Sequence, residues 1–449
     1  MNNRRFARTA GWLALPCLVA AGLLAWYVTR QPASPFEQEQ AAAASFDPAL
    51  VSRGEYVARV SDCVACHSLP GKAPFAGGLE MATPLGAIHA TNVTPDRDAG
   101  IGAYSLADFD RAVRQGVAPG GRRLYPAMPY PSYVKLSDDD MRALYAFFMK
   151  GVQPASQPNV PSDIPWPLNM RWPIALWNGL FAPTTPYAAK PAEDALWNRG
   201  AYIVQGPGHC GSCHTPRGLA FNEKALDESG APFLAGALLD GWYAPSLRQD
   251  ANSGLGRWSE PQIVQFLKTG RNKHAVVYGS MTEAFNNSTQ FMADEDLAAI
   301  ARYLKSLPGD PQRDGTPWQY QDVSAARLDS PGAHTYVTRC ASCHGLDGQG
   351  QAEWMPPLAG ATSALAKENA SAINITLNGS QRVVAAGVPD AYRMPAFREQ
   401  LSDREIAEVL TFVRGTWGNQ GGAVDAQAVG KLRGHTDPAS SSPIILHMR

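Results

Sequence analysis

The sequence predicts a mainly helical protein built from three tandem copies of one domain plan. The first observation is a five-residue unit, Cys-x-x-Cys-His, which occurs three times and contains six of the seven cysteines. The second is a capped amphipathic helix at the end of each copy, so that the plan recurs at about 120 to 150 residues, a domain-sized period. The third is the length of 449 residues, which suits about three domains of roughly 150 residues each.

Each Cys-x-x-Cys-His unit is typical of a covalent haem attachment site, in which two thiols bond to the haem vinyl groups and the adjacent imidazole ligates the iron. Zinc sites usually combine two such cysteine pairs, whereas these pairs are isolated and each has its own histidine. The sequence therefore predicts three haem c groups. Their thiols and axial histidines are Cys63, Cys66 and His67, then Cys210, Cys213 and His214, then Cys340, Cys343 and His344.

The N-terminus has the features of a targeting segment. Arg4, Arg5 and Arg8 precede an uncharged, mostly apolar run from Thr9 to Thr29, which is long for a signal-peptide core and just long enough to span a membrane. We expect residues 1–30 to be either a signal peptide or an uncleaved anchor, and the lack of an adjacent small-residue cleavage site favours the anchor. Positive residues would then stay in the cytoplasm and the remaining chain would be exported.

Composition shifts divide the rest of the chain. We expect a flexible tether at 31–47, domains at 48–155, 196–310 and 331–420, linkers at 156–195 and 311–330, and a C-terminal tail at 421–449. The first linker is rich in proline and contains the apolar stretch from Trp172 to Trp177 and Phe181. Packing between the first two domains is the favoured role for this stretch, and contact with a membrane interface, a partner or a quinone is the alternative. The net charge of −1 gives no electrostatic case for a nucleic-acid partner.

The helices that frame each motif follow a common pattern. A glycine stands nine, ten and eight residues before the first cysteine of the three motifs, as Gly54, Gly200 and Gly332. We expect these glycines to permit close helix approach, with a nearby tyrosine covering the contact. The closing helices begin near Ser137, Asp294 and Ser402, where hydroxyl and carboxylate groups can cap backbone N–H groups and suit the helix dipole.

A haem held by one histidine needs a second axial ligand or an open site, and methionine sulfur favours electron transfer. The predicted ligands are Met128, Met281 and Met394, each framed by proline or glycine before a closing helix. Met292 and Met355 are competitors, the first too close to its helix and the second too close to His344. The remaining histidines are assigned to the surface or to ordinary hydrogen bonds, although His209 adjoins Cys210 and is a candidate for tuning that haem.

From about residue 50 to 420 the chain resembles the three-haem cytochrome c subunit of membrane-bound periplasmic dehydrogenases of the alcohol, gluconate, sorbitol and fructose type. The resemblance implies class I cytochrome c-like domains and an electron-transfer subunit that is not an enzyme on its own. The stretches that carry it are 54–67, 91–95, 124–131, 166–173, 206–217 and 416–419.

The resemblance also implies the partners. Electrons would come from a catalytic dehydrogenase subunit that holds pyrroloquinoline quinone or flavin, and would pass through the haems to ubiquinone. The complex, with or without a small third subunit, would lie on the periplasmic side of the bacterial cytoplasmic membrane. The rival function is a haem subunit that feeds a terminal oxidase or acts as a peroxidase-type protein, which requires an open sixth coordination site.

Overall fold

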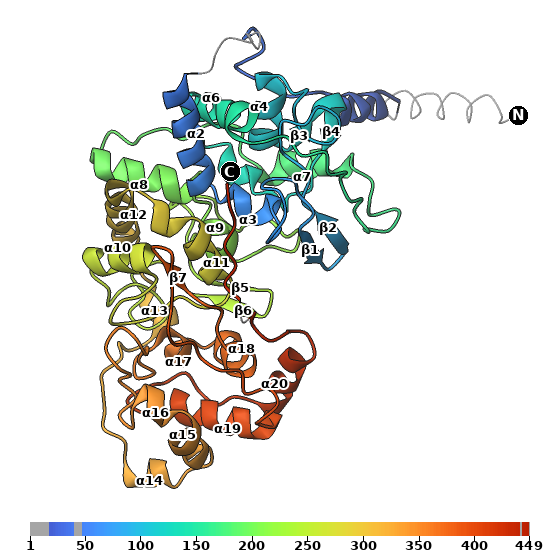
Figure 1. The fold of residues 1–449 in the computed structure, drawn as a ribbon. Helices are drawn as coiled ribbons and strands as arrows, with labels where there is room; N and C mark the ends of the chain where they lie inside the picture. The colour runs from blue at the N-terminus through green and yellow to red at the C-terminus, as the bar shows by residue number, and fades with distance from the viewer. Residues whose placement is uncertain (1–17, 40–46, 441, 449) are drawn as a thin grey trace, which may run out of the picture.

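The structure is a computed structural model that describes residues 18–39, 47–440 and 442–448. Within these ranges the protein is mainly helical, and its sheets are four separate two-stranded antiparallel hairpins. Figure 1 shows three helical bodies arranged in chain order, which we call the first, second and third units. The mainly helical fold class predicted from the sequence is confirmed.

The first unit carries the first motif between two long helices. Its hairpins place Glu80 opposite His89 and Val117 opposite Arg123. The elements are α2 (Pro48–Val60), α3 (Cys63–His67), β1 (Glu80–Thr83), β2 (Gly86–His89), α4 (Leu106–Gln115), β3 (Val117–Ala118), a 3-10 turn (Pro119–Gly121), β4 (Arg122–Arg123), α5 (Tyr130–Tyr133) and α6 (Asp138–Ala146), which continues as a π-helical turn (Phe147–Gly151).

The second unit follows after α7 (Pro173–Phe181) in the first linker. It repeats the plan with one formal hairpin, in which Ala237 pairs with Ala244. Its elements are α8 (Ala195–Gln205), α9 (Gly211–His214), β5 (Ala237–Leu239), β6 (Trp242–Ala244), α10 (Glu260–Thr269), α11 (Ser280–Asn287), a 3-10 turn (Thr289–Phe291) and α12 (Asp294–Ser306).

The third unit is reached through α13 (Pro311–Asp314) and α14 (Ala325–Leu328). Its hairpin places Val384 opposite Pro389. Its elements are α15 (Ala333–Arg339), α16 (Ala341–His344), α17 (Thr362–Leu365), α18 (Ala370–Asn378), β7 (Val384–Ala385), β8 (Val388–Pro389), α19 (Asp403–Arg414) and α20 (Ala426–Arg433).

The closing helices form where the sequence predicts them, with one correction at their caps. The Ser137 hydroxyl caps α6, and Ser402 forms a capping box with Glu405 at the start of α19. The cap of α12 is Ala293 rather than Asp294, and its N–H donates to the Tyr56 hydroxyl at 3.1 Å. The acceptor for the N–H of this N-cap residue is therefore supplied by another unit, which no local sequence pattern reveals.

The predicted glycine contacts are confirmed in all three units. Gly54 packs on the backbone of α6, Gly200 on that of α12 and Gly332 on that of α19. A methyl group in place of the glycine hydrogen would lie 1.9, 1.9 and 2.2 Å from the carbonyl oxygens of Ala143, Ala299 and Glu408. Only glycine permits helices to cross at this separation, because these contacts are far inside van der Waals distance.

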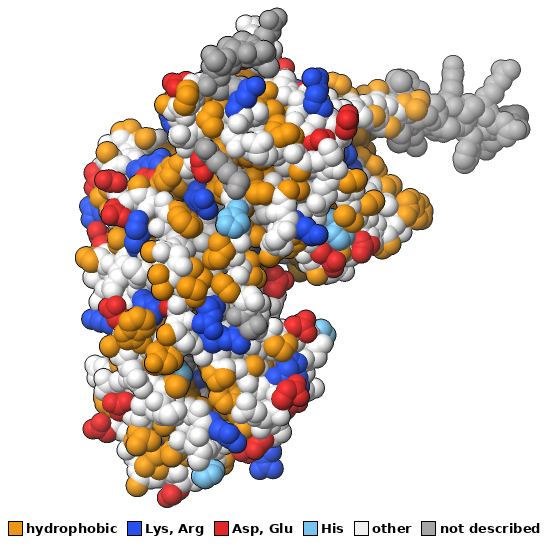
Figure 2. Space-filling view, viewed as in Figure 1, with side chains coloured by type: hydrophobic (Ala, Val, Ile, Leu, Met, Phe, Trp, Pro, Cys, Tyr) orange, Lys and Arg blue, Asp and Glu red, His pale blue; other side chains and the backbone are white. Residues whose placement is uncertain are grey.

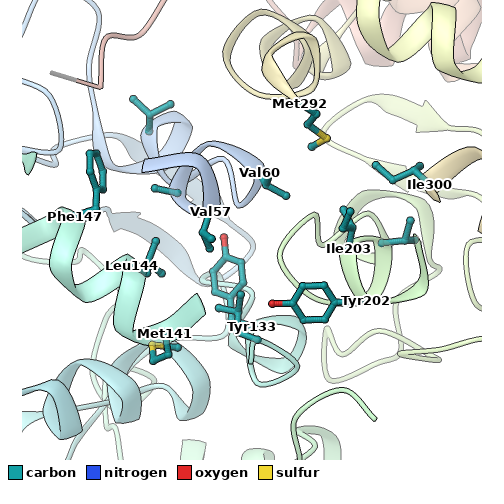
Figure 3. Close-up of a cluster of buried hydrophobic side chains, with 14 of the residues drawn as sticks. Val57, Val60, Tyr133, Met141, Leu144, Phe147, Tyr202, Ile203, Met292 and Ile300 are labelled. Carbon is teal, nitrogen blue, oxygen red and sulfur yellow. The ribbon is translucent and has the colours of Figure 1, made fainter. Parts of the chain in front are cut away.

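The first two units share one hydrophobic core. Figure 3 shows Val57 and Tyr133 of the first unit facing Tyr202 and Ile203 of the second, and all belong to one cluster of buried side chains. The third unit has its own core around Tyr336, with the other members drawn entirely from residues 333–429. The molecule is therefore a fused pair plus a separate third body.

Reciprocal ion pairs reinforce the fused pair. Asp140 of α6 accepts hydrogen bonds from Arg53 of its own unit and from Tyr202 of the second unit. Asp296 of α12 in turn accepts from Arg199 of its own unit, at 2.7 Å, and from Tyr56 of the first unit, at 2.6 Å. In each unit a tyrosine thus donates to the aspartate of the other unit, as equivalent residues do across a two-fold axis.

The described parts of the tether and the tail pack on the rest of the protein. Phe36 is fully buried and Ser34 donates to Asp110 at 2.7 Å, so residues 31–39 pack on the first unit. After residue 420, α20 packs on α18 and α19, and the tail then runs back to the fused pair (Figure 1). There Leu446 and Met448 join the shared core. Burial of a few apolar side chains accounts for this packing.

Residues 18–29 form a helix that leaves the first unit beside α7 and β4 (Figure 1). The earlier part of the predicted targeting segment, residues 1–17, lies outside the described residues. Over the part of the chain that is described, we find no helix with the length and apolar character that a bilayer-spanning segment needs.

Candidate haem-attachment sites

Each motif folds into a single helical turn directly after the first helix of its unit. The turns are α3, α9 and α16. In a helix, residues three and four positions apart lie on the same side, so each turn gathers its two cysteines and its histidine. The six cysteines are free thiols, not disulfides, as attachment to haem vinyl groups requires. Burial raises the pKa of Cys66 and of Cys210, each to about 12.

Each motif histidine is oriented in the same way by a backbone carbonyl. The Nδ1 atoms of His67, His214 and His344 lie 2.6, 2.7 and 3.0 Å from the carbonyl oxygens of Thr91, Pro245 and Pro356 respectively. Nδ1 can only be the donor to a carbonyl, so the tautomer is fixed and the Nε2 lone pair is left for a metal. Burial lowers the pKa of each imidazole, which keeps the ring neutral as a ligand must be.

A glycine in the left-handed region holds the main chain of each histidine. The N–H groups of Gly77, Gly236 and Gly350 donate to the carbonyls of His67, His214 and His344 at 2.8, 2.8 and 2.9 Å. Their φ angles are 76°, 89° and 70°. Sequence reasoning missed these glycines because their distance from the histidine differs in each unit.

These features fit a covalently bound haem c. Two thiols on one turn can bond to the porphyrin edge, and the oriented imidazole can bind iron through Nε2. The hydrogen bond at Nδ1 is the outer contact that metal-ligating histidines usually make, and it increases the basicity of the ligand. Among the described residues no cluster of three or more His, Cys, Asp or Glu side chains offers a competing metal site.

The three predicted methionine ligands occupy equivalent places in the chain. In each unit a helix ends at a glycine with left-handed backbone, which is Gly116 after α4, Gly270 after α10 and Gly379 after α18. A short antiparallel turn follows, formed by β3 and β4, by the pair Arg271 and Val276, and by β7 and β8. Next come the half-buried methionines, which are Met128, Met281 and Met394.

The surroundings of these methionines are not identical. Met128 packs against the same hydrophobic cluster as Cys63, and Met394 against the same cluster as Cys340. Met281 packs instead on a small cluster of Val277, Phe285 and Val383, the last from the third unit, whereas Cys210 packs on the shared core. The structure thus brings two of the three methionines to the hydrophobic cluster of their own motif.

The competing methionines have structural positions. Met292 is buried in the shared core near Ile300 (Figure 3), one residue before the N-cap of α12. It corresponds to Leu136 of the first unit, which also directly precedes the N-cap of its closing helix. Met355 lies in the segment that holds His344, where its backbone pairs with Gln351.

The first two motifs lie next to each other. His209, which immediately precedes Cys210, places its Nε2 atom 3.2 Å from the carbonyl oxygen of Ser61, two residues before Cys63. The Tyr133 hydroxyl donates to the same carbonyl at 2.8 Å, and its ring meets that of His209 edge to face. Burial lowers the pKa of His209. The sequence singled out His209 by its position, whereas nothing in the sequence indicated Tyr133.

Three histidines oriented for metal binding on turns that also carry two free thiols define a c-type cytochrome. Comparison with known proteins agrees: the cytochrome c family model matches residues 198–308 and 330–417. These ranges contain the second and third motifs but not the first. The first motif falls within the longer matches to individual relatives.

Several relatives match most of the chain. The cytochrome c subunit of alcohol dehydrogenase (quinone) from Gluconacetobacter polyoxogenes is 48% identical over 406 residues, 88% of this chain and 86% of that protein. The gluconate 2-dehydrogenase cytochrome c subunit from Pantoea cypripedii is 50% identical over 397 residues, 86% and 90% of the two chains. The fructose dehydrogenase cytochrome subunit from Gluconobacter japonicus is 35% identical over 412 residues, 85% and 82% of the two chains.

The chain therefore belongs to the family of cytochrome c subunits of dehydrogenases. It is an electron-transfer protein with covalently bound haem c, and not itself a catalytic subunit.

Proposed function

We propose that the chain carries three haem c groups and relays electrons from a catalytic dehydrogenase subunit to membrane ubiquinone. The observation that carries the proposal is the threefold repetition of one histidine geometry, in which Nδ1 is bonded to a carbonyl and Nε2 is left for iron. The covalent attachments are Cys63, Cys66, Cys210, Cys213, Cys340 and Cys343, and the axial ligands are His67, Met128, His214, Met281, His344 and Met394.

A bound haem c supplies reversible one-electron chemistry. The side chains that would hold the iron set its potential and access, because a methionine sulfur as the second ligand would raise the potential and leave no position for an external ligand. The turn and hairpin before each methionine hold it in a defined place. In the third unit Met394 exchanges two hydrogen bonds with Ser380, at 3.0 and 2.9 Å.

The direction of transfer is supported by the names of the relatives, which include an alcohol dehydrogenase (quinone), a gluconate 2-dehydrogenase and a fructose dehydrogenase. The donor subunit would hold pyrroloquinoline quinone or flavin, whose two electrons are passed on singly, and a small third subunit would complete some such complexes. The adjacency of the first two motifs through His209 and Ser61 supports direct transfer between the haems of the fused pair.

The location that suits this role is the periplasmic side of the bacterial cytoplasmic membrane. Its support is the apolar N-terminal run with Arg4, Arg5 and Arg8 before it, since positive residues are retained in the cytoplasm. Thiols that attach haem must also be exported in this arrangement.

The test is the haem content and axial ligation of the purified holoprotein. A pyridine haemochrome assay should give three haem c per chain, and a ratio of two or fewer would overturn the proposal. Met128→Ala, Met281→Ala and Met394→Ala should each remove one third of the absorbance band that reports methionine bound to ferric haem. Met292→Leu is the matched control, because this buried methionine lies in the shared core, and it should leave the band unchanged. If one of these three methionine variants leaves the band intact, that methionine is not an iron ligand, and an open coordination site on that haem is favoured.

A further inference from the structure

The linker helix α7 exposes apolar side chains along its outer side. Trp172, Leu176 and Leu180 are spaced four residues apart, which places them on one face of the helix, and all three are exposed. The opposite side is fixed to the protein, because Ile174 and Ala175 are buried. Packing between the first two domains, favoured from the sequence, therefore accounts for only the inner side of α7.

Neighbouring segments extend this apolar face. In the loop before α7, Trp166 is 78% exposed, and in the second unit Leu219 is fully exposed. The loop that bears Leu219 is fixed to α7, because the Trp177 indole N–H donates to the Ala220 carbonyl at 2.8 Å. We define the α7 surface as Trp166, Leu168, Trp172, Leu176, Leu180 and Leu219.

The N-terminal helix lies directly against α7. The Tyr27 hydroxyl donates to the Ala175 carbonyl at 3.4 Å, and the space next to Gly179 is filled by the same hydroxyl. Leu23 and Trp26 of this helix are exposed, each at 61%. In the view of Figure 2, apolar side chains continue from the start of this helix along the adjoining edge of the molecule. The two helices thus present one apolar region.

The segment around α7 carries few charges, and the exposed Asp163 flanks it on the N-terminal side. Residues 164–181 contain no acidic side chain and one basic residue, Arg171, whose guanidinium lies 3.5 Å from the centre of the Tyr125 ring. Arg30 lies over Tyr27 at the end of the N-terminal helix, at 4.7 Å. Tryptophan and tyrosine together with arginine at the margin of an apolar face are typical of a membrane–water interface, and the arginines suit anionic headgroups.

We propose that the α7 surface is seated in the lipid headgroup region, with α7 lying in the plane of the membrane as an interfacial helix. This inference rests on the membrane location given under the proposed function and adds a second contact to the N-terminal segment. The first unit, whose Tyr130 hydroxyl donates to Asn178 of α7 at 2.7 Å, then lies against the bilayer. Single exposed apolar residues elsewhere, such as Leu346 or Val388, lack this continuity.

The test uses the full-length holoprotein in vesicles of phosphatidylethanolamine and phosphatidylglycerol that contain a phospholipid with a diazirine on its acyl chain. After illumination and digestion, mass spectrometry should find lipid adducts in residues 164–181 as well as in 18–29. Adducts confined to the N-terminal segment would overturn the proposal. So would adducts in 164–181 that disappear when the catalytic subunit is bound, because the surface would then belong to a protein partner.

The variant Trp172→Ser, Leu176→Ser, Leu180→Ser should lower labelling of 164–181 about tenfold or more, since three large apolar side chains no longer favour burial in lipid. The matched control is Leu346→Ser, Val388→Ser, Tyr392→Ser, three exposed apolar residues of the third unit, which should leave labelling unchanged. Haem c absorbance per chain reports folding. If the helix variant loses haem, the loop variant Trp166→Ser, Leu219→Ser replaces it and should lower labelling in the same direction. A wrong haem count in the unsubstituted protein would refute the relay without altering the labelling result.

Discussion

The first two units and the third unit are built on one plan but are joined to the molecule in different ways. The first and second units share a hydrophobic core. The Tyr56 and Tyr202 hydroxyls each donate a hydrogen bond across the boundary to an aspartate of the other unit. The third unit meets the second through a small apolar cluster of Val277, Phe285 and Val383 and through polar contacts, such as those of Asn286 and Gln290 with the backbone of Val384. A shared apolar core couples the stabilities of two bodies far more strongly than polar contacts do, because it cannot be divided without exposing both halves.

The side chains responsible for the difference can be identified. Arg53 and Arg199 each precede the glycine of the helix crossing, and each binds a buried aspartate at the third position of the closing helix. In the third unit the residue before Gly332 is Pro331, and the third position of α19 is Glu405, which is exposed and serves the capping box. The third unit therefore lacks the side chains that form the reciprocal contact, and it is joined to the second unit by other contacts.

The largest expected effect concerns loss of a haem site in one unit. Cys63→Ser with Cys66→Ser should remove one of the three proposed haems and also expose the second unit to protease, because Cys63 and Cys210 pack on the same core. Cys340→Ser with Cys343→Ser should remove one haem and leave the fused pair intact. Pyridine haemochrome assays with limited proteolysis measure both effects. Equal protease sensitivity of the fused pair in the two variants would contradict the comparison.

The next effect concerns the reciprocal aspartates. Asp140→Ala or Asp296→Ala removes a buried carboxylate that accepts hydrogen bonds from an exposed arginine and from a tyrosine of the other unit. Each substitution should lower the free energy of unfolding of the fused pair by about 2 kcal/mol. Denaturant titration with separate probes for the fused pair and the third unit gives the measurement. Asp403→Ala is the control, because its partly exposed pair with Arg433 should contribute less than about 1 kcal/mol. A control loss as large as that at Asp140 would show that burial is not the reason.

A smaller effect should come from the returning tail. Leu446 and Met448 are buried in the shared core, and the Leu446 N–H donates to Asn287 at 2.8 Å. Leu446→Ala or Met448→Ala should each cost about 2 kcal/mol and increase protease cleavage between the second and third units. His447→Ala, an exposed neighbour between them, should change neither. Unchanged cleavage in the Leu446 and Met448 variants would mean that the tail does not hold the third unit in place.

The smallest expected effect is a dependence of stability on pH in the second unit. Burial, followed by the charges of Arg257 and Lys273, lowers the pKa of His274 to about 4, and the ring stacks on Trp258 at 5.2 Å. The unfolded state then binds a proton more readily than the folded state, so stability is complete above about pH 6.5 and falls as the pH drops toward 4. At pH 5 the loss should be about 1 kcal/mol once screening at this half-exposed ring is included.

Denaturant titrations at about pH 7 and pH 5 test this dependence, with His274→Gln as the variant that should abolish it. The loss should spread to the first unit through the shared core and leave the third unit unaffected. A pH dependence that persists in the variant would assign the effect to another group.

Much of the candidate site was predictable from local pattern. The motifs and the closing helices depend on residues close together in the chain. The glycines of the helix crossings were predictable from their repeated spacing before each motif, although their contacts are distant in sequence. The carbonyls of Thr91, Pro245 and Pro356 were not predictable, because they lie 24, 31 and 12 residues from the histidines that they orient. The same applies to Tyr133, which reaches the first motif only after the chain has folded back.

The sequence by itself determined what each unit is: a thiol pair and an imidazole on one turn, a framed methionine and a capped closing helix. Only the tertiary structure decided how the units are related. The fusion of the first two, the return of Leu446 to their core and the exposure of Trp172, Leu176 and Leu180 all depend on which apolar surfaces find partners. Spacing along the chain records which residues are apolar, whereas the choice of partner is made by burial in three dimensions.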